Sequence, residues 1–132
     1  RIGGGPPVPP FVPPELQIES WLESLDRIRK LNVRKLYLPH FGPVEGSIPE
    51  HLDNLAERIS RWANWFRDRM RAGEGEAELV PAFADLVTQE LRKAGANEKK
   101  IQDYEYADPS FMAVGATLRY WQKYHPDEVR PE

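Results

Sequence analysis

Apolar residues recur at spacings of three and four along most of the chain, which is the pattern of helices that bury one face. The first such stretch runs from Glu15 to Asn32, and its apolar stripe consists of Ile18, Trp21, Leu22, Leu25, Ile28 and Leu31. On the other face, Glu23 and Arg27 form an i,i+4 pair in the favourable order. The spacing therefore predicts an amphipathic helix over 15–32.

A second helix is predicted over 47–72. Ser47 and Glu50 match the S-x-x-E capping box, with a proline in the first helical turn, and Gly73 marks the end. The apolar stripe is Leu52, Leu55, Ile59, Trp62, Phe66 and Met70, with Trp65 beside it. Acidic residues are interleaved with arginines at 58, 61, 67, 69 and 71, which favours a solvated face over a phosphate-binding track. His51, in the first turn, is interpreted as a surface residue.

Three further helices are predicted in the remainder of the chain. Apolar spacing indicates a helix over 78–94 closed by Gly95, with Pro81 in or near its first turn. Asn97 is suited to cap a short helix that carries Ile101 and Tyr104. Pro109 opens a last helix over 110–124, in which Gly115 either weakens the helix or admits a close neighbour.

One short strand is predicted over 35–38, where Leu36, Tyr37 and Leu38 form an apolar run bounded by turn residues. No second strand is evident in the sequence. A lone strand leaves its amides without partners. The prediction is therefore that it pairs with a copy of itself or with a sheet outside this sequence.

Residues 1–14 contain three glycines and six prolines, which disfavour a regular helix or strand. The stretch is predicted to be an extended connector with polyproline character. A PxxP ligand at Pro6–Pro9 is an alternative, but no flanking basic residue orients it, and a crossover within a larger fold is favoured.

Composition excludes several classes of protein. The 132 residues carry 18 basic and 21 acidic side chains, a net charge of −3, which argues against a nucleic-acid or membrane-surface binder. There is no cysteine, hence no disulfide or thiolate metal site. No apolar run approaches the roughly 18–20 residues of a membrane span, and no signal segment is recognisable, so a cytoplasmic location is expected.

Candidate chemistry is concentrated at His40. It follows the short strand directly and precedes Phe-Gly-Pro, and the carboxyl end of a strand is a rigid edge on which functional groups are often mounted. A neutral imidazole there could ligate a metal, although an isolated histidine is more often structural. His125 and the acidic segment Asp103, Glu105 and Asp108 are interpreted as solvated surface, with a cation site at the acidic segment as the less favoured alternative.

The order of these segments resembles the C-terminal part of a metallo-β-lactamase-fold hydrolase. The resemblance lies in Ser24-Leu-Asp-Arg-Ile-Arg-Lys-Leu, Leu36-Tyr-Leu-Pro-His-Phe-Gly-Pro-Val44 and Glu50-His-Leu-Asp-Asn-Leu. In that family a helix precedes a last strand, the strand delivers the final metal-binding histidine, and another helix follows. Residues 75–132 resemble, less specifically, the helical extension of glyoxalase II-like members.

The resemblance implies a mostly α chain: a C-terminal fragment of an αββα metallo-β-lactamase fold, with one short strand over 35–38, plus a helical extension. Residues 1–14 would be the connector, 15–72 the end of the metallo-β-lactamase-like domain and 75–132 the extension. His40 would bind one of two zinc ions. The H-x-H-x-D-H motif, the middle histidine and the bridging aspartate have no counterpart here, and in the family they lie upstream.

Two functions are consistent with the sequence. The favoured one is part of a binuclear zinc hydrolase acting on a small-molecule substrate, in which this chain alone lacks most metal ligands and is not itself a hydrolase. Its expected partners are the upstream part of its own fold and a second copy of itself. The alternative is a non-catalytic helical interaction or dimerisation module.

Overall fold

The computed structural model describes residues 5–39 and 41–131. Within these residues the chain is mostly helical and has one very small sheet. Its elements, in order, are α1 (Ile18–Lys30), β1 (Tyr37–Leu38), β2 (Gly42–Pro43), α2 (Ile48–Arg71), α3 (Glu76–Lys93), α4 (Glu98–Ala107), α5 (Ser110–Tyr124) and a short 3-10 turn at Pro126–Glu128. The mostly helical class expected from the sequence is confirmed.

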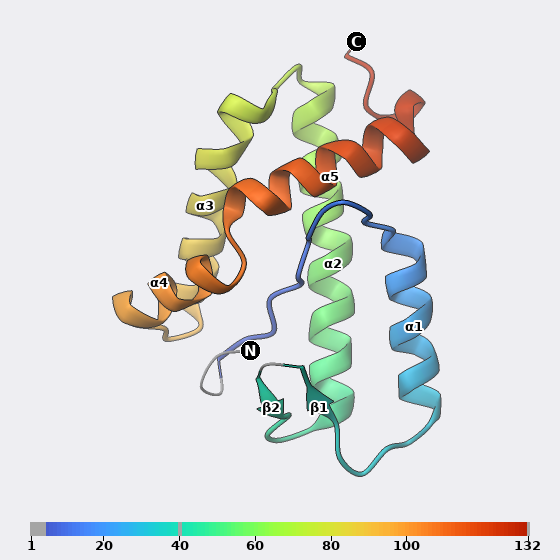
Figure 1. Cartoon of the computed structure of the whole chain (residues 1–132), viewed down its shortest axis with the longest axis vertical. Helices are drawn as coiled ribbons and strands as arrows, with labels where there is room; N and C mark the ends of the chain where they lie inside the picture. The colour runs from blue at the N-terminus through green and yellow to red at the C-terminus, as the bar shows by residue number, and fades with distance from the viewer. Residues whose placement is uncertain (1–4, 40, 132) are drawn as a thin grey trace.

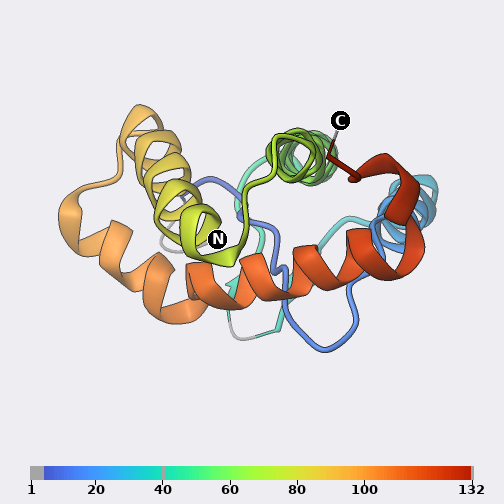
Figure 2. The ribbon, with the colours of Figure 1, turned by 90° about the horizontal axis from the view of Figure 1, so that it is seen from above.

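The long helix α2 is the axis of the fold (Figure 1). It lies alongside α1, while α5 runs across α2 and packs mainly against α3 (Figure 2). Apolar residues of α1, α2, α3 and α5 form one continuous core. Aromatic rings dominate it: Trp62 meets Phe83 edge-on with centroids 4.9 Å apart, and Phe66 lies 4.9 Å from Phe83.

The capping signals in the sequence are confirmed. The Ser47 side chain accepts a hydrogen bond of 3.3 Å from the Glu50 amide at the start of α2. Asn97 accepts one of 2.9 Å from the Lys100 amide at the start of α4. Each bond satisfies an amide that has no partner inside the helix, so each fixes where the helix begins.

The prediction of a lone strand over 35–38 is wrong. Strand β1 covers only Tyr37–Leu38 and pairs antiparallel with β2, with Tyr37 opposite Pro43 and Leu38 opposite Gly42. Gly42 has φ +77°, a backbone conformation that glycine adopts without strain and that lets the chain fold back. The hairpin therefore gives β1 a partner strand within this chain. The strand is no longer a reason to expect a sheet outside this sequence.

The expected start of the third helix is also wrong, and one of the two alternatives for Gly115 is excluded. Helix α3 begins at Glu76, which puts Pro81 in the second turn, because the Glu78 carboxylate accepts a hydrogen bond of 3.0 Å from the Gly75 amide and fixes an earlier start. In α5, a Cβ placed on Gly115 would meet nothing within 4 Å. Gly115 therefore does not serve a close approach between helices.

The proline-rich segment packs against the helices, and its described part, residues 5–14, contains neither helix nor strand. Phe11 is almost completely buried and meets Trp62 edge-on at 6.0 Å. Arg58 donates a hydrogen bond to the Pro7 carbonyl, and Tyr104 donates one of 2.8 Å to the Pro6 carbonyl. The segment thus joins α2 to α4.

Candidate functional site

An apolar cavity of about 330 Å³ lies where the proline-rich segment, α1, the hairpin, the first turns of α2 and the end of α4 meet. We call it the hairpin cavity. Its apolar walls include Val8, Trp21, Phe41 and Leu55, and its polar residues are His51, Tyr104 and Asp108. Because its walls come from segments distant in sequence, the cavity depends on the complete fold.

The predicted metal ligand His40 lies outside the described residues. Its neighbours Leu38, Pro39 and Phe41 line the hairpin cavity. The hairpin that carries them is closed by hydrogen bonds from the Phe41 amide to the Leu38 carbonyl, 3.2 Å, and from the Val44 amide to the Leu36 carbonyl, 2.8 Å. The segment that the sequence singled out therefore borders the apolar cavity.

His51 is buried, with only 3% of its surface exposed, and it lines the hairpin cavity. Its interpretation as a surface residue is therefore wrong. The signal was present in the sequence: His51 precedes Leu55 by four positions and Ile59 by eight, and thus lies on the buried face of α2.

Asp108 follows the last turn of α4 and lines the same cavity. Burial, together with the negative charge of Glu105, raises the pKa of its carboxyl to about 7. Its Oδ1 is buried and has no hydrogen-bond partner among the described residues. The interpretation of the acidic segment as solvated surface is thus wrong for Asp108, which borders the cavity that the proline-rich segment forms with α2 and the end of α4.

The other two acidic residues of this segment have ordinary roles. Asp103 pairs with Lys99 at 3.1 Å along the surface of α4. Glu105 accepts hydrogen bonds from the amide and the hydroxyl of Ser110, at 2.9 and 2.7 Å, and so caps the start of α5. Neither side chain pairs with Asp108.

His125 ties the C-terminal end of α5 to α1. Its Nε2 lies 2.9 Å from a carboxylate oxygen of Glu19, which also accepts a hydrogen bond of 2.6 Å from Tyr120. Its Nδ1 lies 3.3 Å from Glu128. The arrangement is a structural contact between helices and borders neither of the cavities described here.

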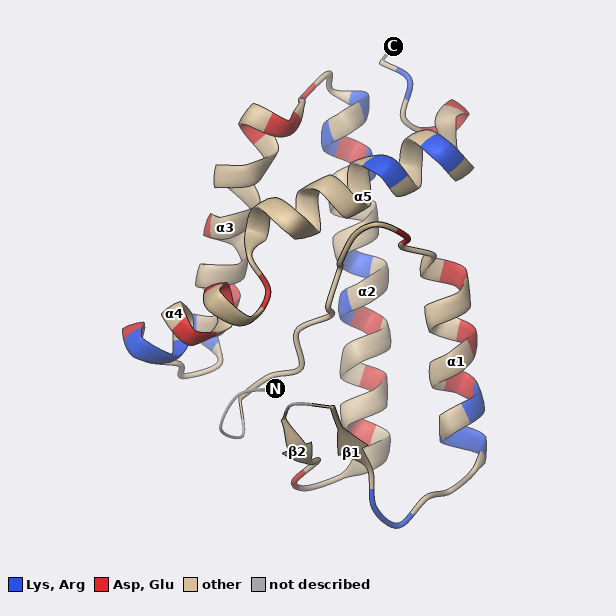
Figure 3. Cartoon of the chain, viewed as in Figure 1, with Lys and Arg blue, Asp and Glu red and all other residues tan. Residues whose placement is uncertain are grey.

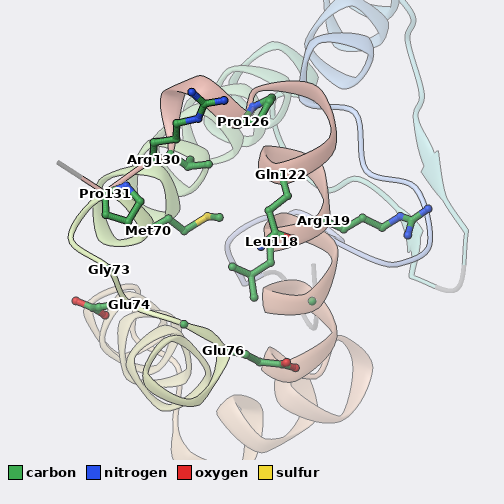
Figure 4. A pocket seen from close by; sticks show the side chains of 13 residues that line it. Met70, Gly73, Glu74, Glu76, Leu118, Arg119, Gln122, Pro126, Arg130 and Pro131 are labelled. Atoms are coloured by element: carbon green, nitrogen blue, oxygen red, sulfur yellow. The ribbon is translucent and has the colours of Figure 1, made fainter.

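A second, more open hollow lies between α5 and the turn that joins α2 to α3 (Figure 4). Met70 and Leu118 supply its apolar side chains, and Glu74, Arg119 and Arg130 supply charge at its edges. Its volume is about 780 Å³. Because the charges are of both signs and lie at the rim, the hollow selects no particular class of ligand.

Across residues 5–39 and 41–131, no group of three or more histidine, cysteine, aspartate or glutamate side chains could hold a metal ion. A catalytic zinc site typically needs three protein ligands. The described residues therefore do not form a zinc site by themselves. In the same residues, no helix combines the length and apolar character that a membrane span requires.

Comparison of the chain with models of known protein families, with curated protein sequences and with solved structures finds no match.

Proposed function

We propose that this chain is the C-terminal part of a cytoplasmic, metal-dependent hydrolase of the metallo-β-lactamase superfamily, with two zinc ions and with His40 as a ligand of one of them. One observation carries the proposal: the segment Leu36–Val44, Leu-Tyr-Leu-Pro-His-Phe-Gly-Pro-Val, follows one amphipathic helix and precedes another. The observed order of α1, hairpin and α2 supports it.

The proposal assigns the other metal ligands to residues that precede Arg1 in a longer protein, because the described residues do not supply them. The resemblance places an H-x-H-x-D-H motif, a further histidine and a bridging aspartate there. No catalytic step is assigned to the described residues. Their proposed role is to hold the hairpin in position and to form one wall of the substrate site.

Apolar exposure at the hairpin end supports contact with such an upstream part. Leu31 at the end of α1, Tyr37 in β1 and Phe41 in the turn are 71%, 62% and 46% exposed. The two strands carry no charged side chain (Figure 3). Large apolar side chains exposed together at one end of a molecule are typical of a surface that is covered by another part of a protein.

The first test is the coding sequence upstream of Arg1, which the proposal expects to contain H-x-H-x-D-H. The second is zinc content and turnover of a thioester or lactone by the longer protein. His40→Ala is expected to lower metal affinity on the order of 10–100-fold or more, with the helices still folded. His125→Ala is the matched control and is expected to retain zinc. Unchanged zinc content and rate in His40→Ala would overturn the assignment.

The 132-residue chain is expected to show no metal-dependent hydrolysis on its own, since one histidine is one ligand. Purified chain would be assayed with thioester, ester and lactone substrates, with and without added zinc. Activity above background that a chelator abolishes would contradict the proposal that the remaining ligands lie upstream.

The second candidate is a non-catalytic interaction or dimerisation module. The aromatic core favours it, because side chains of this chain form that core among themselves. Sedimentation at micromolar concentration separates the two candidates. A fragment with an uncovered hairpin end is expected to self-associate, whereas a monomer that unfolds cooperatively would favour the interaction module.

A further inference from the structure

We propose that the hairpin cavity binds a small apolar amine, with its protonated nitrogen at the carboxyl group of Asp108 and its hydrocarbon body against Trp21 and Leu55. This inference does not depend on the proposed hydrolase function. It uses no metal ion and none of the predicted metal ligands.

The size and walls of the cavity fit such a molecule. Its volume of about 330 Å³ lies at the lower end of the range of roughly 300–1,000 Å³ that is typical of small-molecule sites. Val8, Trp21, Phe41 and Leu55 contribute apolar side chains from four separate segments. A ligand that fills the cavity therefore contacts hydrocarbon over most of its surface.

The polar groups of the cavity select a cation. Tyr104 already donates its hydroxyl hydrogen to the Pro6 carbonyl. The Asp108 Oδ1, in contrast, is buried and accepts no hydrogen bond from any described residue. No lysine or arginine among residues 5–39 and 41–131 pairs with this carboxyl, and the nearby charge of Glu105 is negative. A buried carboxyl without a counter-charge is costly, and an ammonium group supplies both the charge and the hydrogen-bond donors.

Aromatic side chains strengthen the preference for a cation. Trp21, Phe41 and Tyr104 all line the cavity. The faces of aromatic rings attract cations, most strongly where water is excluded. An anionic ligand would be repelled by Asp108 and Glu105, and a neutral ligand of the same shape would gain the apolar contacts but not the charge interaction.

The test uses the 132-residue chain and a pair of probes that differ only in the polar group, 1-naphthylmethylamine and 1-naphthalenemethanol. Binding is followed at pH 8 by the NMR signal of the Trp21 indole N–H, with the indole of Trp65 as an internal control because it does not line the cavity. The amine is expected to bind about tenfold more tightly than the alcohol, as one charge-assisted hydrogen bond implies.

Three variants sharpen the test. Asp108→Asn keeps the shape of the side chain and is expected to bring the affinity ratio of amine to alcohol to about one. Asp103→Asn, within α4 and outside the cavity, is expected to preserve the preference. Val8→Phe, which fills the cavity and keeps every carboxylate, is expected to weaken both probes.

Equal affinity of the two probes for the parent chain would overturn the proposal. So would a preference for the amine that survives in Asp108→Asn with circular dichroism unchanged, or the absence of a saturable shift at Trp21. If Asp108→Asn does not fold, the Val8→Phe variant decides: undiminished binding of the amine there would show that the amine binds elsewhere.

Discussion

Helix α2 borders two regions that are built in opposite ways. Towards its C-terminal half, its side chains meet α3 through edge-on and tilted aromatic rings and a partly buried ion-pair network. At its first turns, it borders the hairpin cavity, where a carboxyl oxygen has no partner and large apolar side chains are exposed nearby. The side chains of the first region pack and pair mainly with one another, whereas the second region leaves groups available for contact.

In the aromatic region Glu90 links three side chains of α2. Glu90 accepts hydrogen bonds from Arg61 and, at 3.2 Å, from the Trp62 indole, and it lies 3.1 Å from Arg58. Arg58 and Glu90 expose only 14% and 15% of their side chains. Arg58 thus departs from the solvated face expected for the arginines of α2, because the proline-rich segment covers it.

The difference between the two regions indicates which of them is available for binding. Buried charges that are fully paired maintain a structure, whereas a buried carboxyl without a partner costs free energy and persists only where the rest of the fold holds it. The hairpin end therefore carries both proposals made here, and the aromatic region serves as their scaffold.

Trp62→Ala is expected to have the largest effect, since its ring contacts Phe11 and Phe83 and is 1% exposed. Loss of a fully buried aromatic ring costs about 3–5 kcal/mol of the free energy of unfolding. Urea denaturation measures this loss. Trp65→Ala is the control, and because the Trp65 side chain is only half-buried, we expect a smaller loss of the free energy of unfolding. A loss below about 1 kcal/mol in Trp62→Ala would show that this region is not the scaffold.

Glu90→Gln is expected to cost about 2–4 kcal/mol, because it leaves the charge of Arg58 buried without its counter-charge. Glu57→Gln, at an exposed partner of Arg61, is the matched control and is expected to change stability by less than about 0.5 kcal/mol. Similar losses in the two variants would mean that burial of the network contributes nothing.

The pH dependence of this network has a definite sign. Burial raises the pKa of Glu90, but hydrogen bonds from Arg61 and Trp62 and the charge of Arg58 outweigh it, so the net pKa is lowered. Its contribution to stability is therefore present above the unfolded pKa of about 4.5 and is lost as the pH falls through the lower folded pKa. Glu90→Gln is expected to flatten the acid limb of the stability profile.

Asp108→Asn is expected to act in the opposite direction and to stabilise the chain by about 1–3 kcal/mol at pH 8. The folded pKa is raised to about 7, from 3.8 in the unfolded chain. Between these values the unfolded state releases a proton that the folded state keeps, so wild-type stability falls as the pH rises. The gain should vanish below about pH 3, where both states are protonated. A destabilising effect at pH 8 would show that the carboxylate has a partner.

Tyr37→Ser and Phe41→Ser are expected to have the smallest effect on the stability of this chain, within about 0.5 kcal/mol, because both side chains are largely exposed. Thermal unfolding measures it. The same substitutions are expected to reduce self-association in sedimentation, whereas a loss of stability comparable to that of Trp62→Ala would place these residues in the core.

Much of the helical architecture could be predicted from the sequence, because amphipathic spacing and caps such as Ser47 and Asn97 act locally. The hairpin could not, since each strand has only two residues and Gly42-Pro43 is typical of a turn. The burial of His51 could have been read from its register with Leu55. The burial of Asp108 could not, because it depends on contacts between the proline-rich segment, α2 and α4, which are far apart along the chain.

The decisive measurement is hydrogen exchange, compared between the 132-residue chain and the proposed longer protein, because the proposal requires the upstream part to pack on the hairpin end. The account predicts that amides around Leu36–Val44 and in the first turns of α2 gain protection in the longer protein, while those around Trp62 and Phe83 stay as they are. Unchanged protection at the hairpin, or a gain confined to α3 and α5, would contradict it.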